Sequence, residues 1–325
     1  TMSRPWLYGL LTGVMIVWGL NVIAVKWIVG AFAPVTITAV RIFIASMSLF
    51  PIVVFGRLLR RPNRREMRYL AVISLSGVLA HHLCLAIGLA NTSSANGGLI
   101  LGTVPIVTSI LAAVMLGVRL SLFRIAGLLS GFAGILLIML GRQNGDWHLA
   151  WGDIFLFLAV LAQAISFIFI KKITTTLEAV VVTGLTQLCG ALLLFVAALQ
   201  LEPYGLASLR EGRWFDWSVV IASGVVATGL GHFIYNTAIQ RVGTVEAAVF
   251  LNMTPLFSLL GSVWLLGETL LARHFLSFIF IVAGVFLGTG IADEWTFRRR
   301  QQRTRQRRTA AWKAQRPTGE PPSFQ

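Results

Sequence analysis

The chain contains ten long apolar segments, and these restrict its fold more than any other feature. An α-helix needs about 20 predominantly apolar residues to cross the hydrocarbon core of a bilayer. Composition agrees, because the 325 residues are 56% hydrophobic and only 12% charged. The segments are Trp6–Val29, Val35–Phe55, Met67–Leu89, Ala95–Gly117, Leu122–Leu140, Trp151–Ile170, Ala179–Leu199, Trp217–Ile239, Val245–Leu266 and Phe275–Ala292. They predict an all-α polytopic membrane protein with ten transmembrane helices.

Positive charge is concentrated on one side of these predicted spans. Of the 27 Lys and Arg residues, 21 lie near the first residues, in the links after spans two, four, six and eight, or in the segment after span ten. The positive-inside rule then places both termini in the cytoplasm, and we expect a bacterial inner (plasma) membrane location. The basic residues 298–325 are expected to form a disordered tail against anionic lipid. Topology explains the charge, so we expect no nucleic-acid partner.

The two halves of the chain resemble each other at an offset of 150 residues. This alignment pairs His82 with His232, Pro105 with Pro255, and Gly134 with Gly284. We therefore predict two five-helix repeats, residues 6–141 and 151–292. A repeat with an odd number of crossings must enter the membrane from the opposite face, so the repeats are expected to be inverted. Inverted repeats are typical of secondary transporters, whose substrate sites lie near the midplane.

The repeated motif resembles the EamA unit of the drug/metabolite transporter superfamily. The residues that carry the resemblance are Ser94–Asn96, Pro105, Leu116 and Gly117 in the first half, and Ala247, Pro255, Leu266, Gly267 and Glu268 in the second. The resemblance implies ten helices, cytoplasmic termini, a central cavity and alternating access. Within the superfamily the chain is most similar to exporters of aromatic and other bulky amino acids. It departs from the pattern at Val118, where the second half carries Glu268.

Three histidines lie near the middle of predicted spans. His81 and His82 belong to span three, and His232 to span eight, where Tyr235 and Asn236 follow at helical spacing. Polar groups inside spans are costly unless they face protein or water, so each is a candidate for binding substrate. The alternative is that each histidine bonds a carbonyl on a neighbouring helix. We expect no metal site, because no Cys or carboxylate accompanies them at that depth.

Other polar or aromatic residues of the spans are further candidates for substrate contact. Trp18 and Asn21 of span one correspond to Gln163 and Ser166 of span six, and these faces are predicted to look at one another. Trp18 could form an aromatic wall or pack against lipid. Arg41 lies about two turns into span two, where it could bind a substrate carboxylate or a structural carbonyl. We expect spans one, three, four, six, eight and nine to line the cavity.

Spans four and nine each contain one further candidate for substrate contact, Asn96 in span four and Asn252 in span nine. Each of the two spans also contains a proline. Pro105 and Pro255 are predicted to be matching kinks near mid-depth that let the helices bend during transport. Glu246 begins span nine beside Arg241, which favours an ion pair at the surface or at a gate. The glycines of span five include a GxxxG, which favours close packing inside the bundle over dimerisation.

These features predict a secondary transporter that exports amino acids with large uncharged side chains. The sequence lacks the Walker A, HExxH and G-x-S-x-G motifs, so we expect neither an enzyme nor a cofactor. We expect a monomer with small-molecule substrates, the lipid bilayer being its other partner. The main alternative is a multidrug or lipophilic-cation exporter of the same superfamily. An intramembrane enzyme or a receptor is disfavoured, because we find neither clustered carboxylates nor an extramembrane sensing domain.

Overall fold

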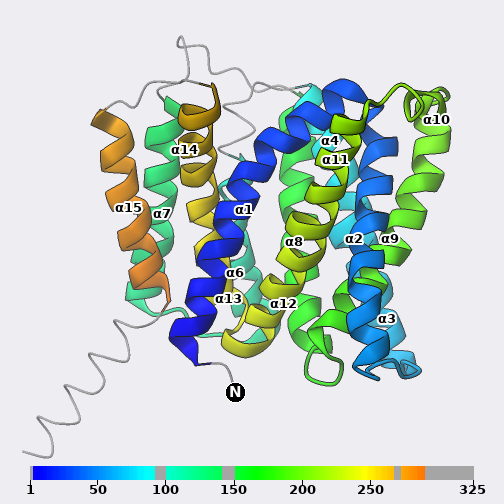
Figure 1. Ribbon diagram of the computed structural model, residues 1–325. Helices are drawn as coiled ribbons and strands as arrows, with labels where there is room; N and C mark the ends of the chain where they lie inside the picture. Colours follow the sequence, from blue (N-terminus) through cyan, green and yellow to red (C-terminus); the bar gives the residue numbers. More distant parts are fainter. Residues whose placement is uncertain (1–2, 92–99, 141–150, 267–271, 290–325) are drawn as a thin grey trace, which may run out of the picture.

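The structure, a computed structural model, describes residues 3–91, 100–140, 151–266 and 272–289. Every regular element within these ranges is a helix, as the sequence predicted (Figure 1). The first half contains α1 (Arg4–Ala31), α2 (Pro34–Phe55), α3 (Arg64–Ile73), the π-helix η1 (Ser74–Ala80), α4 (His81–Ala90), α6 (Val104–Leu116) and α7 (Leu122–Leu140). The second half contains α8 (Trp151–Ile173), α9 (Ala179–Leu201), α10 (Gly205–Ser208), α11 (Trp214–Ala222), the π-helix η2 (Ser223–Leu230), α12 (Gly231–Val242), α13 (Thr244–Val249), the 3-10 helix η3 (Phe250–Met253), α14 (Thr254–Leu266) and α15 (Ala272–Gly288).

Seven helical stretches among the described residues are long and apolar enough to cross a membrane. Several unite consecutive elements, since α3, η1 and α4 run on as one stretch, as do α11, η2 and α12. Three further apolar helical segments are shorter, within α6, α7 and α15. The chain is thus a multi-pass membrane protein, with helices in each of the ten predicted segments.

Local sequence signals explain where several helices begin and end. Pro5 and Pro34 lie in the first turns of α1 and α2, where a missing N–H breaks no helical hydrogen bond. A capping box starts α3, because the Asn63 side chain accepts from the backbone N–H of Glu66 while the Glu66 carboxylate accepts from that of Asn63. Gly117 ends α6 with φ of 68°, a left-handed conformation that glycine adopts without strain.

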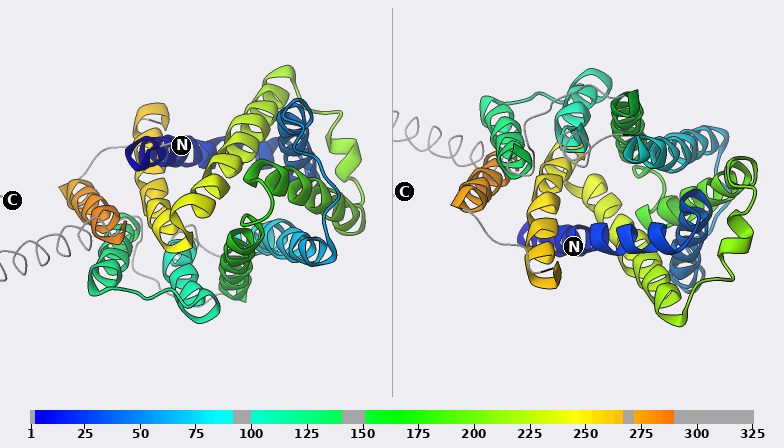
Figure 2. Two further views of the ribbon diagram at one scale, coloured as in Figure 1. Left: turned by 90° about the horizontal axis from the view of Figure 1, so that it is seen from below. Right: turned by 90° about the horizontal axis from the view of Figure 1, so that it is seen from above.

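The helices of the two halves interleave in one bundle. α2 packs on α9 and η2, both α4 and α6 pack on α8, and α1 packs on α14. Figure 2 shows α7 and α15 paired at one edge of the bundle. There a Cβ on Gly127 would come within 2.7 Å of the Gly284 carbonyl oxygen, and one on Gly134 within 2.9 Å of the Ser277 carbonyl. The glycines of span five therefore serve packing within the chain, as predicted.

Basic links gather at one end of the bundle. Arg60, in the link after α2, donates to the carbonyl of Thr176 in the link after α8 (3.0 Å). Gln240, near the end of α12, donates to another carbonyl of that same link (2.8 Å). Arg124 at the start of α7 lies 3.9 Å from Glu246 of α13. The first residues of α1 and the last residues of α15 lie at this end as well (Figure 1).

At the opposite end of the bundle, a carboxylate connects the two halves of the chain. Glu202, which follows α9, accepts from the backbone N–H groups of Val35 and Thr36 (2.8 Å each) and from the Thr36 hydroxyl (2.7 Å). These are free donors in the first turn of α2, and a carboxylate also interacts favourably with the helix dipole there. Glu202 therefore caps α2 from the other half of the chain.

Candidate pocket between the two halves

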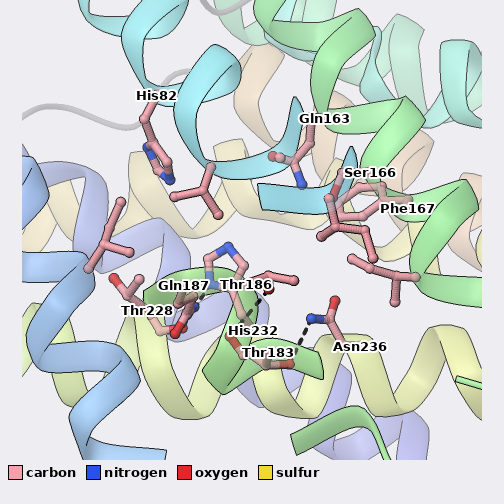
Figure 3. A pocket seen from close by; sticks show the side chains of 15 residues that line it. His82, Gln163, Ser166, Phe167, Thr183, Thr186, Gln187, Thr228, His232 and Asn236 are labelled. Atoms are coloured by element: carbon pink, nitrogen blue, oxygen red, sulfur yellow. Dashed lines mark hydrogen bonds between the residues drawn. The ribbon is translucent and has the colours of Figure 1, made fainter. Parts of the chain in front are cut away.

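A small polar pocket lies between helices from both halves of the chain (Figure 3). One side is formed by α2, α3, η1 and α4, and the other by α8, α9, η2 and α12. Gln163 lies about 18 Å from the first residue of α8 and about 15 Å from the last, at 1.5 Å per residue. The pocket is therefore near the middle of a helix that is long enough to span a bilayer. The lining residues are Ile42, Ile73, Gly77, Val78, His82, Gln163, Ser166, Phe167, Ile170, Thr183, Thr186, Gln187, Thr228, His232 and Asn236.

Two π-helices at corresponding places in the halves border this pocket. In η1 the bonding shifts to a spacing of five residues, as the N–H of His81 donates to the Ser76 carbonyl. In η2 the N–H of Gly231 donates to the Val226 carbonyl in the same way. π-Helices are rare and are often found at functional sites. η1 ends directly before His81 and η2 ends two residues before His232, so the rotation of His82 and His232 about their helix axes depends on these elements.

Thr228 organises the polar wall of the pocket. Its carbonyl accepts from Nε2 of Gln187 (3.0 Å) and from Nδ1 of His232 (2.9 Å). Its hydroxyl accepts from Nη1 of Arg41 (3.1 Å) and donates to the Ser223 carbonyl (3.0 Å). One residue of η2 thus connects a cation, an amide and an imidazole.

Arg41 is buried directly behind that wall. The residue is 7% exposed, and its guanidinium contacts the hydroxyls of Thr228 and of Ser223 (3.4 Å). Ser223 in turn donates to Oδ1 of Asn21 (2.6 Å). The structure pairs Arg41 with no carboxylate among the residues it describes. A buried cation held by neutral groups alone is costly, so this position favours an anion nearby.

Five residues predicted to bind substrate line the pocket: His82, Gln163, Ser166, His232 and Asn236. They come from the third, sixth and eighth predicted spans, and so from both halves. The remaining lining residues belong to those spans and to α2 and α9. We had expected spans one, four and nine to contribute as well, but among the residues that the structure describes none from these spans lines the pocket.

Four further predicted residues lie just outside the lining. The Trp18 ring packs on His232 (centroids 4.9 Å apart) and on Tyr235 (5.3 Å), while its indole N–H donates to the Ala227 carbonyl (2.7 Å). Tyr235 is fully buried. His81 turns to α8, with Nδ1 2.9 Å from the Ala159 carbonyl. Asn21 contacts Ser223, as described above. Trp18 and Tyr235 thus hold His232 in place from behind.

The other predicted residues lie farther away or outside the described residues. Asn252 is buried in η3 next to Gly131 of α7. Pro105 lies in the first turn of α6, after a turn at residues 102–103, and Pro255 in the first turn of α14, after η3. Pro105 thus begins a helix after a turn, where we had expected a kink in a continuous helix, whereas Pro255 follows the 3-10 helix η3 inside the continuous helical stretch Thr244–Gly261. Asn96 lies outside the described residues.

Sequence reasoning missed the contribution of α9 to the pocket. Thr183, Thr186 and Gln187 form one wall, yet only Gln187 is a polar residue unusual enough in a span to attract notice. Threonines are common in membrane helices because their hydroxyls bond the preceding turn, as Thr186 does to the Val182 carbonyl (2.8 Å). Polarity alone therefore did not single them out.

Glu246 is buried rather than at a surface. It is 3% exposed, accepts a short hydrogen bond from the Tyr8 hydroxyl, and lies 3.9 Å from Nη2 of Arg124. We had expected an ion pair with Arg241, five residues earlier, at the surface or at a gate. Tertiary contacts instead bring it to α1 and α7, at the end where the basic links gather.

Comparisons with known proteins agree with this architecture. The chain is 23% identical over 296 residues to the uncharacterized transporter YyaM of Bacillus subtilis, covering 89% of this chain and 95% of that protein. It is 25% identical over 281 residues to a probable amino-acid metabolite efflux pump of Escherichia coli, covering 84% and 91%. A crystal structure that is 20% identical superposes with a TM-score of 0.74 over 88% of this chain and 97% of that one, which shows the same fold.

A protein family also matches, once in each half of the chain. Residues 5–140 match the EamA-like transporter family, and residues 150–289 match it a second time. Together the two matches cover most of the chain. The chain therefore belongs to the EamA-like transporter family.

Proposed function

We propose that the protein is a secondary transporter that exports amino acids with aromatic or other bulky uncharged side chains by alternating access. One observation carries the proposal: a polar pocket near mid-depth is lined by residues of both halves of the chain. Mid-depth sites between repeats are where secondary transporters bind their substrates. Relatives from Escherichia coli and Salmonella typhimurium bear the name of amino-acid metabolite efflux pumps, which supports an amino acid as the substrate.

The size of the pocket supports a mechanism that requires opening. Its volume is about 30 Å³, whereas one water molecule needs roughly 10–15 Å³ by this measure. The pocket thus has room for about two waters, and no amino acid fits without movement of its walls. A site at mid-depth with so little room must widen to admit a substrate, which is the kind of movement that alternating access requires.

Ten transmembrane helices in two inverted repeats are part of this proposal. It is supported by the two family matches, by the two π-helices at corresponding places, and by the start of α1 and the end of α15 lying at the same end of the bundle. An even number of crossings brings the ends to one side. The concentration of basic links at that end supports cytoplasmic termini in a bacterial inner membrane. Because the glycine faces of α7 and α15 are used within the chain, we propose a monomer as the working unit.

Transport by the purified protein in liposomes tests the proposal. We expect uptake of labelled phenylalanine or leucine into proteoliposomes preloaded with the same amino acid, and none into protein-free liposomes. A pH gradient applied in either direction reports whether protons are coupled. Absence of flux for every amino acid tested would refute the substrate class.

A lipophilic-cation exporter is the second candidate, and the same vesicles discriminate it. The buried guanidinium of Arg41 disfavours a cation that lacks an anionic group, because like charges repel strongly where water is scarce. We therefore expect lipophilic cations to compete poorly with phenylalanine.

A further inference from the structure

The orientation of the Gln187 side-chain amide is determined by its hydrogen bond. Gln187 is 4% exposed, and one end of its amide lies 3.0 Å from the Thr228 carbonyl oxygen. A carbonyl only accepts, so that end must be the NH₂ group. The other end, Oε1, is buried and finds no donor among the residues that the structure describes.

The orientation of the Asn236 amide also follows from its hydrogen bond, in this case to a hydroxyl that donates its own proton elsewhere. The Thr183 hydroxyl donates its proton to the Ala179 carbonyl (2.7 Å), so toward Asn236 its oxygen can only accept. The end of Asn236 that lies 2.9 Å from it must therefore be the NH₂ group. Oδ1 of Asn236, which is 4% exposed, is likewise left without a donor within the described ranges.

Other groups of the pocket also offer acceptors. The Thr186 hydroxyl donates to the Val182 carbonyl, which leaves its lone pairs for the pocket. Nδ1 of His232 lies on a carbonyl and must carry the proton, so in the neutral ring Nε2 is an acceptor. Gln163 and Ser166 can present either kind of group. The wall formed by α9 and α12 is thus rich in acceptors, and two of them are buried without a donor.

We propose that Oε1 of Gln187 and Oδ1 of Asn236 bind the ammonium group of the substrate, so that the pocket selects solutes carrying a protonated amine. An ammonium group has three donors and no acceptor, which complements two orphan amide oxygens. Buried acceptors without partners favour a ligand that satisfies them, and bonds to a charged donor are stronger than neutral ones.

Arg41 supplies the opposite charge for the other end of such a solute. Its guanidinium bonds the hydroxyl of the same Thr228 whose carbonyl anchors Gln187. A cation and a pair of acceptors on one wall offer opposite partners to the carboxylate and ammonium groups of an α-amino acid. This assignment rests on the proposed function, and it names the two oxygens that bind the ammonium group of the substrate.

Competition assays with three phenyl compounds test the assignment in proteoliposomes. Labelled phenylalanine uptake is competed by unlabelled phenylalanine, by 3-phenylpropionate, which lacks the amine, and by phenylalaninamide, which lacks the carboxylate. In the unsubstituted protein we expect phenylalanine to compete at least about tenfold better than 3-phenylpropionate. In Gln187→Met and Asn236→Leu, this preference for the amine should fall by about tenfold, while discrimination against phenylalaninamide stays.

Two further variants separate amine recognition from general damage. Thr108→Val removes a hydroxyl that is fully buried and has no partner within the described residues, yet lies outside the pocket, so it should leave the preference unchanged. Asn236→Asp keeps an acceptor and adds a negative charge, to which the Thr183 hydroxyl can turn its proton. It should retain or increase the preference for the amine. An unchanged preference in both Gln187→Met and Asn236→Leu would overturn the assignment while the proposed function stands.

If the vesicles transport no amino acid, a binding measurement in detergent still tests the amine site separately from the proposed transport function. The thermal unfolding midpoint is then measured with phenylalanine, 2-phenylethylamine and 3-phenylpropionate. Stabilisation by the two amines alone, lost in Gln187→Met and Asn236→Leu, would support the amine site for a different substrate. Equal or absent effects of the three compounds would overturn it.

Discussion

The close approach of η1 to α8 beside the pocket leads to a quantitative prediction. A Cβ added to Gly77 would lie 2.6 Å from Cβ of Ser166, and nearer still to its Oγ. Ser166 is only 2% exposed, and rotation of its side chain would move Oγ but not Cβ, which is fixed to the backbone of α8. Gly77→Ala must therefore push the π-helix away from α8 or distort it.

The expected magnitude is best expressed as a coupling between the two positions. Overpacking typically costs about 1–3 kcal/mol, whereas Ala gains up to about 1 kcal/mol over Gly in helix propensity. These opposing terms leave Gly77→Ala destabilised by roughly 1–2 kcal/mol. Ser166→Gly removes both clashing atoms, so in the double variant the overpacking disappears and only the propensity terms remain. The double-mutant cycle should thus give a coupling of about 2 kcal/mol that favours the double variant.

Unfolding in mixed micelles of increasing SDS content measures all four proteins of this cycle. Phenylalanine counterflow on the same preparations shows whether restored packing also restores transport, which we expect to be lower in Gly77→Ala. Gly184→Ala is a matched control, because its added Cβ would lie 4.0 Å from the nearest atom, Cβ of Leu49. A coupling near zero, with Gly77→Ala as stable as the unsubstituted protein, would refute the packing argument.

Four other perturbations have defined outcomes. Glu202→Gln weakens the cap on α2 and should cost about 1 kcal/mol, seen in SDS unfolding and as faster hydrogen exchange in that turn. Glu246→Gln removes the charge of a buried hydrogen-bonded carboxylate and should cost about 1–3 kcal/mol by the same unfolding assay. His82→Ala and His232→Ala should each lower phenylalanine counterflow by about tenfold, and unchanged flux in both would assign these histidines a structural role. Pro105→Ala should slow transport by making the break before α6 less favourable; full transport rates would contradict a bending role for that proline.

The predictable part of the fold depends on properties that are local along the chain. The apolar segments were found from length and composition, because a bilayer requires about 20 apolar residues whatever a helix packs against. The capping box at Asn63 and Glu66 and the helix end at Gly117 are likewise encoded within a few residues. The distribution of Lys and Arg among the links also needs no tertiary information.

The candidate site was predictable only in part. His82, Gln163, Ser166, His232 and Asn236 were selected because polar residues at mid-span are costly, and the structure places all five on the pocket. The same criterion also selected residues that lie outside the pocket. The cost of placing a polar side chain in a span does not indicate whether that side chain faces a cavity or a neighbouring helix. The turn before Pro105 was not predicted either, since a proline tolerates both a kink and a helix start.

By itself, then, the sequence determined a multi-pass helical protein with charge gathered on one side and a family motif present twice. Tertiary structure alone decided which polar groups share a cavity, since that depends on the rotation of each helix about its axis. Two π-helices set this rotation for the histidines, and the packing of α9 brings Gln187 and two threonines to the same wall. It also decided which way the buried amides point, because their orientation follows from acceptors on neighbouring turns and helices.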